Sequence, residues 1–239
     1  MPELSAVNDN GTPPAPDTSR AILFVAKLDG RALASGGGAV LAAQTWGTTG
    51  RNDAYSVTTD KDDNIIVAGA IGGNVDFGGG FPVTNLGATD AFVAKLSHLS
   101  LATTVWAQSF GDAAFDQTIN SVSTASSGDV YIAGSFEGSL GALGLNSASN
   151  TAVDGFTAQL SGSTGAPVNG CAHKYGDALG AQAVSVITVA RPAVTPPADT
   201  IMIGGSFTNY MDFGGHPALT PLFSGGAGIA ASYVTVIAP

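Results

Sequence analysis

Short segments in which apolar and polar residues alternate recur along the chain, and each predicts a half-buried β-strand. The pentapeptide FVAKL occurs at 24–28 and again, unchanged, at 92–96. Degenerate copies follow as FTAQL at 156–160 and YVTVI at 233–237. The recurrence of one strand pattern predicts an all-β protein built from internal repeats.

Three further elements accompany these strands in a constant order. Each unit begins with an aromatic residue followed by glycine, at 46–47, 110–111 and 175–176. A second predicted strand comes next, at 54–59, 119–124 and 183–189, and then a strand that runs into glycine, at 65–71, 130–136 and 201–207. After a Gly-rich loop comes the FVAKL-type strand. Four short strands in each unit, separated by Gly and Asn/Asp turns, are typical of a β-propeller blade.

The repeats divide the chain into five segments. Residues 1–20 read as a flexible tail or linker and 21–43 as a lone strand with a Gly-rich loop; the three predicted blades are 44–104, 105–168 and 169–239. The third carries a Pro-rich insertion, ARPAVTPPAD, where the first has the compact turn DKDDN. Since proline cannot donate to a β-ladder, we expect this insertion at the tip of a surface hairpin.

The first unit carries a resemblance to a known family. Its succession of WG, NDAYSVTTDKDDNIIVAG, VDFGGG and TDAFVAKL resembles the SBBP β-propeller repeat of bacterial proteins that are often secreted or on the cell surface. The resemblance extends over 21–237 and is closest in this unit. It implies antiparallel blades around an axis, with binding, adhesion or scaffolding as the usual supposed role, and it supplies no catalytic residues.

Three blades and one strand are fewer than the roughly four to eight blades of a closed propeller. The chain is therefore expected to be part of a larger ring or to complete a ring by pairing with another copy. The strand at 21–28 is the expected closing element, since it can complete the sheet of a neighbouring blade.

The composition and net charge of the chain limit the classes of partner that it can bind. Hydrophobic residues make up 44% and charged residues only 11%, and the formal net charge is −10. A net-negative surface repels nucleic acid and anionic lipid, so the expected partner is a protein or a glycan. The start of the chain has neither the basic nor the apolar segment of a signal peptide, and no stretch predicts a membrane span. We expect a mature or excised piece of an exported protein, secreted or at the cell surface.

One turn has the spacing of calcium ligands. Asp60, Asp62 and Asn64 form D-x-D-x-N, in which alternate oxygens can converge on one cation. However, Ile65 stands where such a loop needs glycine, and no glutamate follows. A plain hairpin turn, which Asp and Asn favour, is the preferred interpretation, and calcium is the only cofactor that the sequence suggests.

Aromatic residues offer a candidate ligand platform. Trp46, Trp106 and Tyr175 can stack on sugars if a blade edge exposes them, but packing between blades is the favoured interpretation. The aspartates that precede equivalent strands, Asp53, Asp90, Asp116 and Asp154, read as repeated turn caps. Cys171, the single cysteine, and His173 are read as neighbours on one strand face without a task.

No catalytic motif is present in the sequence, so the chain is predicted not to be an enzyme. The preferred hypothesis is a non-catalytic propeller module of a surface or secreted bacterial protein that binds protein or glycan, or serves in adhesion or scaffolding. One alternative is a propeller-type glycan hydrolase or lyase domain. The other is a structural repeat that completes a ring by self-association.

Overall fold

The computed structural model describes residues 21–31, 39–148, 152–178, 180–190, 199–208 and 211–213, and the backbone of 231–237. The predicted tail at 1–20, nearly all of the Pro-rich insertion and the side chains of the YVTVI segment lie outside the described residues. Among the described residues no helix has the length and hydropathy that a membrane span requires.

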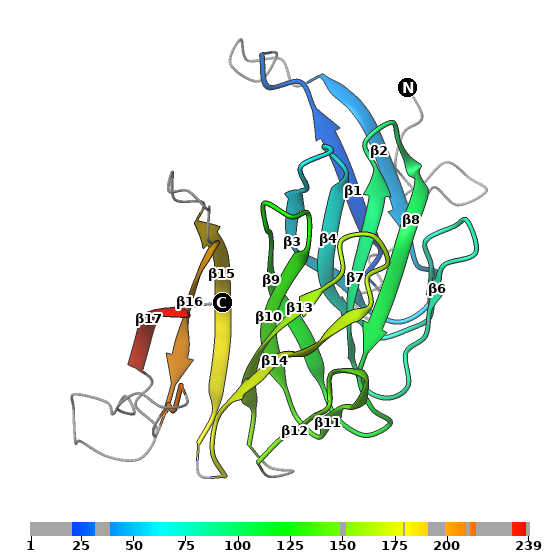
Figure 1. Cartoon of the computed structure of the whole chain (residues 1–239). Helices are drawn as coiled ribbons and strands as arrows, with labels where there is room; N and C mark the ends of the chain where they lie inside the picture. Colours follow the sequence, from blue (N-terminus) through cyan, green and yellow to red (C-terminus); the bar gives the residue numbers. More distant parts are fainter. Residues whose placement is uncertain are drawn as a thin grey trace.

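The protein is all-β and its sheets are antiparallel (Figure 1). The longer strands are β1 (Leu23–Leu28), β2 (Val40–Trp46), β3 (Asn52–Thr59), β4 (Ile65–Ile71), β7 (Asp90–Ser97), β8 (Ser100–Phe110), β9 (Gln117–Thr124), β10 (Val130–Phe136), β13 (Asp154–Leu160), β14 (Pro167–Tyr175), β15 (Gln182–Ala190), β16 (Thr200–Phe207) and β17 (Ala231–Ile237). The Gly-rich loops contain the short strands β5 (Val75–Asp76), β6 (Pro82–Val83), β11 (Ser139–Leu140) and β12 (Leu145–Asn146), and the 3₁₀ turn η1 (Gly141–Leu143).

Four larger sheets succeed one another in chain order (Figure 1). The first is the β1–β2 hairpin. The second is β3-β4-β7-β8 and the third is β9-β10-β13-β14; β15-β16-β17 form the fourth, which is three-stranded in the described part of the chain. The strands predicted from alternation and from the glycine-ending segments are thus confirmed.

A β-bulge explains the glycine near the end of each central strand. The first strand of each complete sheet bulges at one residue, Tyr55 in β3 and Asn120 in β9, next to the pairs Ala54–Gly69 and Ile119–Gly134. A Cβ atom at Gly69 would collide with the carbonyl oxygen of Asp53. Because the bulge brings the backbones this close, only glycine fits opposite it.

The sheets are offset from the sequence repeats. The aromatic–glycine strand, which opens each repeat in the sequence, pairs with the FVAKL-type strand of the preceding repeat: β8 with β7, and β14 with β13. The complete sheets therefore extend over 52–110 and 117–175, and the expected blade boundaries at 104/105 and 168/169 fall inside β8 and β14.

Serine side chains connect equivalent strands of successive sheets. The Val122 N–H in β9 donates to Ser56 Oγ in β3, at 3.1 Å, and the Ile187 N–H in β15 donates to Ser121 Oγ in β9, also at 3.1 Å. Ser56 and Ser121 occupy the same register position, since they pair with Ala68 and Ala133. The second sheet consequently meets the third as the third meets the fourth.

Candidate functional site

The turn with calcium-like spacing is closed by its own hydrogen bonds. Asp60 is buried, and its Oδ1 accepts the backbone N–H groups of Asp62 and Asn64, both at 2.9 Å. Its Oδ2 accepts Asn64 Nδ2 at 3.1 Å. These are the bonds by which an aspartate stabilises a hairpin turn.

A buried ion pair completes this turn. The Lys95 ammonium of β7 lies 2.6 Å from Asp60 Oδ2, and the two side chains are 9% and 1% exposed. Lys95 Nζ also donates to the Gly162 carbonyl oxygen in the following sheet, at 2.8 Å. Burial by itself raises the pKa of Asp60, but the hydrogen bonds from Lys95, Asn64 and the turn backbone outweigh it, so the pKa lies below its usual value.

The second repeat also connects the FVAKL-type strand to this turn, with different residues and at a different position of the turn. Gln159 stands at the position of Lys95, and its Nε2 donates to Asp129 Oδ2 at 3.1 Å. Asp129 occupies the position of Asn64, while Ala125 replaces Asp60. Because the link persists when the charges change, it serves the structure at this position.

The carboxylate of Asp62, the remaining calcium candidate, has a different partner. The Asp62 side chain is exposed and pairs with Lys61 at 2.8 Å. Within the described residues, no group of three or more His, Cys, Asp or Glu side chains is arranged to hold a metal ion. With Asp60 already neutralised by Lys95, this geometry favours the structural turn, and calcium binding stays the alternative hypothesis.

The three aromatic candidates lie in the core. Trp46, Trp106 and Tyr175 are 7%, 2% and 4% exposed. Trp106 Nε1 donates to the Gly162 carbonyl oxygen at 3.1 Å, and the Tyr175 hydroxyl lies 3.0 Å from Thr157 Oγ1. The geometry therefore favours the packing interpretation over a sugar platform, since a sugar needs an open ring face.

Two repeated carboxylates sit at the junctions between sheets. Asp90 and Asp154 are fully buried, and their Oδ2 atoms accept the Leu86 and Ala148 N–H groups, both at 2.6 Å. Their Oδ1 atoms have no hydrogen-bond partner among the described residues. Burial raises the pKa of both carboxyls. A Cβ at Gly111 would collide with Asp90, which explains the glycine of the aromatic–glycine motif.

The other polar candidates remain separate from these groups. Asp53 pairs with Arg51 on the surface at 2.6 Å, and Cys171 is a free, half-buried thiol. The Asp116 carbonyl oxygen accepts the Glu137 N–H at 3.1 Å. His173 lies on β14 in register with Thr157, and it is exposed. These residues do not converge on one reactive centre.

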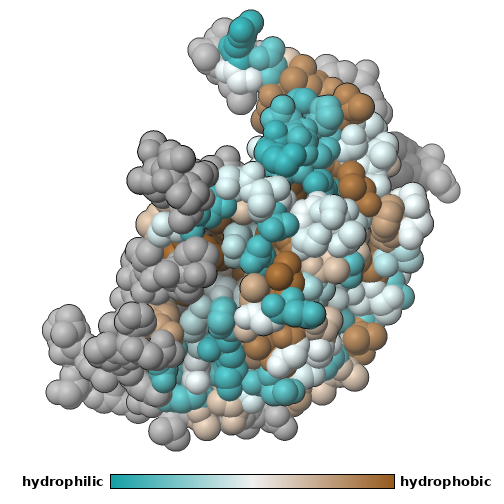
Figure 2. Space-filling model, viewed as in Figure 1, coloured by the Kyte–Doolittle hydropathy of each residue, from teal (hydrophilic) through white to brown (hydrophobic). Residues whose placement is uncertain are grey.

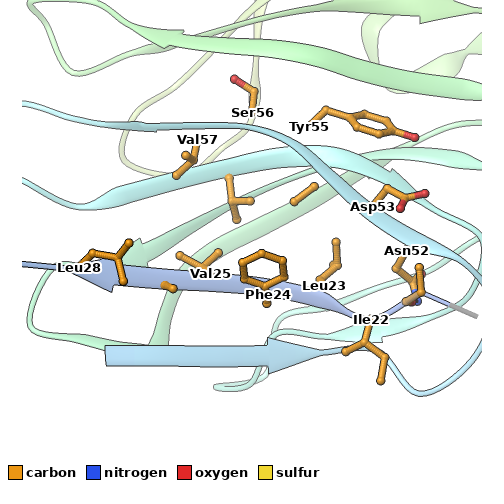
Figure 3. Close-up of a pocket in the computed structure, with 14 residues that line it drawn as sticks. Ile22, Leu23, Phe24, Val25, Leu28, Asn52, Asp53, Tyr55, Ser56 and Val57 are labelled. Carbon is orange, nitrogen blue, oxygen red and sulfur yellow. The ribbon is translucent and has the colours of Figure 1, made fainter. Parts of the chain in front are cut away.

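A hollow lies between β1 and β3. It has a volume of about 450 Å³ and is lined by residues 21–26, 28, 52–57 and 67. Figure 3 shows Val57 projecting from β3 toward β1, which carries Phe24 and Leu28. These three side chains are exposed although they are hydrophobic. Hydrophobic surface also lies over the β1–β2 hairpin, toward the top of Figure 2, where Val40 and Leu41 are exposed.

Sequence reasoning missed the residues that join the sheets. Lys95 lies within the FVAKL motif, whose pattern predicts a strand but no role for the lysine. Gln117 and Gln182 are fully buried at the start of β9 and β15. They stand at the same distance after the aromatic–glycine pairs at 110–111 and 175–176, and this recurrence in the sequence could have identified them as structural residues. No protein-family model matches the chain, and no curated protein matches it either.

Proposed function

We propose that this chain is a non-catalytic, propeller-type repeat module of a surface or secreted bacterial protein, and that it binds another protein. The bacterial and extracellular setting follows from the SBBP resemblance. The observation that carries the binding role is the apolar groove between β1 and β3, where Phe24, Leu28 and Val57 are exposed.

The chemistry of the buried groups supports a role other than catalysis. Lys95 and Asp60 neutralise each other, and Asp90 and Asp154 recur at equivalent places of successive sheets. A reactive centre requires different groups that converge on one substrate atom. The burial of Trp46, Trp106 and Tyr175 supports protein over glycan as the proposed ligand, because a sugar needs an open ring face.

The experiment pans a random peptide display library against the chain and against its Val57→Glu variant, with a glycan array run in parallel. We expect β-prone peptides that the wild-type chain enriches and the variant does not. Val105→Glu is the matched control, because Val105 is an exposed valine on β8 outside the groove. A glycan that binds equally to all three proteins, with no peptide enriched, would refute the proposal.

A further inference from the structure

The β1–β2 hairpin meets the second sheet as the second sheet meets the third. The Asn52 N–H at the start of β3 donates to the Ala21 carbonyl oxygen at 3.1 Å, and the Gln117 N–H at the start of β9 donates to the Thr89 carbonyl oxygen at 2.8 Å. Parallel bridges join Ala21 to Arg51 and Thr89 to Asp116. The hairpin thus occupies the place of the third and fourth strands of a sheet.

The FVAKL-type strand has two neighbours in the complete sheets and one in the first. Strand β7 lies between β4 and β8, and β13 lies between β10 and β14. In the described part of the chain, β1 pairs only with β2. Its other edge presents backbone N–H and C=O groups at which an added strand can pair.

The exposed fractions of equivalent side chains show which packing contacts are missing beside β1 and β3. Val122 and Ile187 are each 5% exposed, because the first strands of neighbouring sheets pack together, whereas the equivalent Val57 is 63% exposed. Phe92 and Phe156 are fully buried, whereas the equivalent Phe24 is 65% exposed. The groove is therefore the place where two further strands would lie over β3.

Glycine is the residue that the repeats place beside this phenylalanine. Gly69 of β4 pairs with Phe92, and Gly134 of β10 pairs with Phe156. A Cβ on Gly134 would lie 2.9 Å from a ring carbon of Phe156, so the ring covers the glycine closely. A strand added at β1 should likewise have glycine opposite Phe24.

The positive charge of Lys27 predicts an acidic turn in the added hairpin. Lys27 of β1 is equivalent to Lys95, which pairs with Asp60 in the turn between β3 and β4. Lys27 is exposed and forms no ion pair within the part of the chain that the structure describes. An acidic turn at this place would complement Lys27 as Asp60 complements Lys95.

We propose that the open edge of β1 and the groove between β1 and β3 bind a β-hairpin of the same repeat type, carried by a partner protein, with a glycine opposite Phe24 and a carboxylate beside Lys27. This inference rests on the proposed protein-binding function and names its partner. The mode is strand addition, in which main-chain hydrogen bonds supply affinity and side-chain pockets supply specificity.

The probe is a fluorescent peptide with the sequence of residues 52–71, which contains both Asp60 and Gly69, and the assay is fluorescence anisotropy with the whole chain. We expect saturable binding that Val57→Glu in the protein weakens by about tenfold or more, equivalent to about 1.4 kcal/mol, while Val105→Glu leaves it unchanged. Gly69→Val in the peptide should weaken binding to a similar extent.

A charge exchange tests the pairing at Lys27. We expect Lys27→Glu in the protein to weaken binding of the wild-type peptide by about fivefold, and Asp60→Lys in the peptide to restore it. Lys27 and Val57 are both exposed, so neither substitution should prevent folding. Circular dichroism checks that each protein variant folds.

Three results would overturn the inference. One is equal binding of the wild-type and Gly69→Val peptides. Another is a dimer of the chain, seen by light scattering, that Val57→Glu dissociates and that excludes the peptide, because the occupant would then be a second copy. The third is failure of this peptide to bind while library peptides still bind through Val57, which would leave the proposed function intact.

Discussion

Replacement of Lys95 by methionine tests the buried ion pair most directly. The substitution keeps the length and the apolar stem of the side chain but removes the ammonium that lies 2.6 Å from Asp60 Oδ2. The carboxylate would still accept the backbone N–H groups of Asp62 and Asn64 and the Asn64 side-chain amide, but it would remain buried as an uncompensated charge. We therefore expect folding to be destabilised by about 3 kcal/mol.

Lys61→Met is the matched control. Lys61 also pairs with an aspartate, Asp62, at 2.8 Å, but the two side chains are 50% and 60% exposed. Water screens such a pair, so its loss should leave the stability nearly unchanged. The assay is equilibrium urea unfolding, followed by the fluorescence of the tryptophans, since Trp106 shares the Gly162 carbonyl oxygen with Lys95.

The second repeat indicates which substitutions should restore the stability that is lost with the ion pair. The triple variant Lys95→Gln, Asp60→Ala, Asn64→Asp reproduces Gln159, Ala125 and Asp129, and we expect it to recover most of the lost stability. The reasoning would be refuted if Lys95→Met proved no more destabilising than Lys61→Met, because the pair would then behave as a solvated one.

The remaining predictions concern the glycines, the serine links and the response to pH. Gly134→Ala should destabilise the protein by about 2–3 kcal/mol because of its close backbone neighbours, whereas Gly141→Ala, with open space around it, should change stability by less than about 1 kcal/mol in the same urea assay. Ser121→Ala should cost about 1 kcal/mol by leaving a backbone N–H of β15 without its acceptor, and no change in unfolding would contradict the proposed link between sheets. The raised pKa of Asp154 adds stability below about pH 4 that is lost as the pH rises through the folded-state pKa, so Asp154→Asn should gain stability relative to the wild type between pH 4 and pH 7. Asp60, whose pKa is lowered, contributes stability that is fully present above about pH 4 and is lost as the pH falls through its folded-state pKa, so Asp60→Asn should be less stable than the wild type above about pH 4, and this deficit should shrink as the pH falls further. Urea curves at several pH values, with both variants changing in the same direction, would contradict these signs.

The sequence by itself determined the strands and their recurrence. Alternation of apolar and polar residues is a local property, and it located β1, β7 and β13 within one or two residues of their bounds. The glycine at the end of the central strands was also visible, because the same bulge recurs opposite Gly69 and Gly134. A repeated local pattern requires only that each copy meet the same local constraint.

The tertiary structure decided which strands belong together. The strand that ends at Phe110 opens a repeat in the sequence, yet its backbone pairs with β7 of the preceding repeat. Pairing depends on which edges meet in space, and a period in the sequence looks the same for every choice of starting strand.

The candidate site depended on tertiary contacts as well. Lys95 and Asp60 are far apart in the sequence, and only the pairing of β4 with both β3 and β7 brings their side chains together to neutralise the turn. Phe24 and Phe92 stand in identical pentapeptides, but one is 65% exposed and the other is buried. Burial is a property of the neighbours that a strand acquires on folding, and the edge of β1 that has no strand partner among the described residues is therefore visible only in the structure.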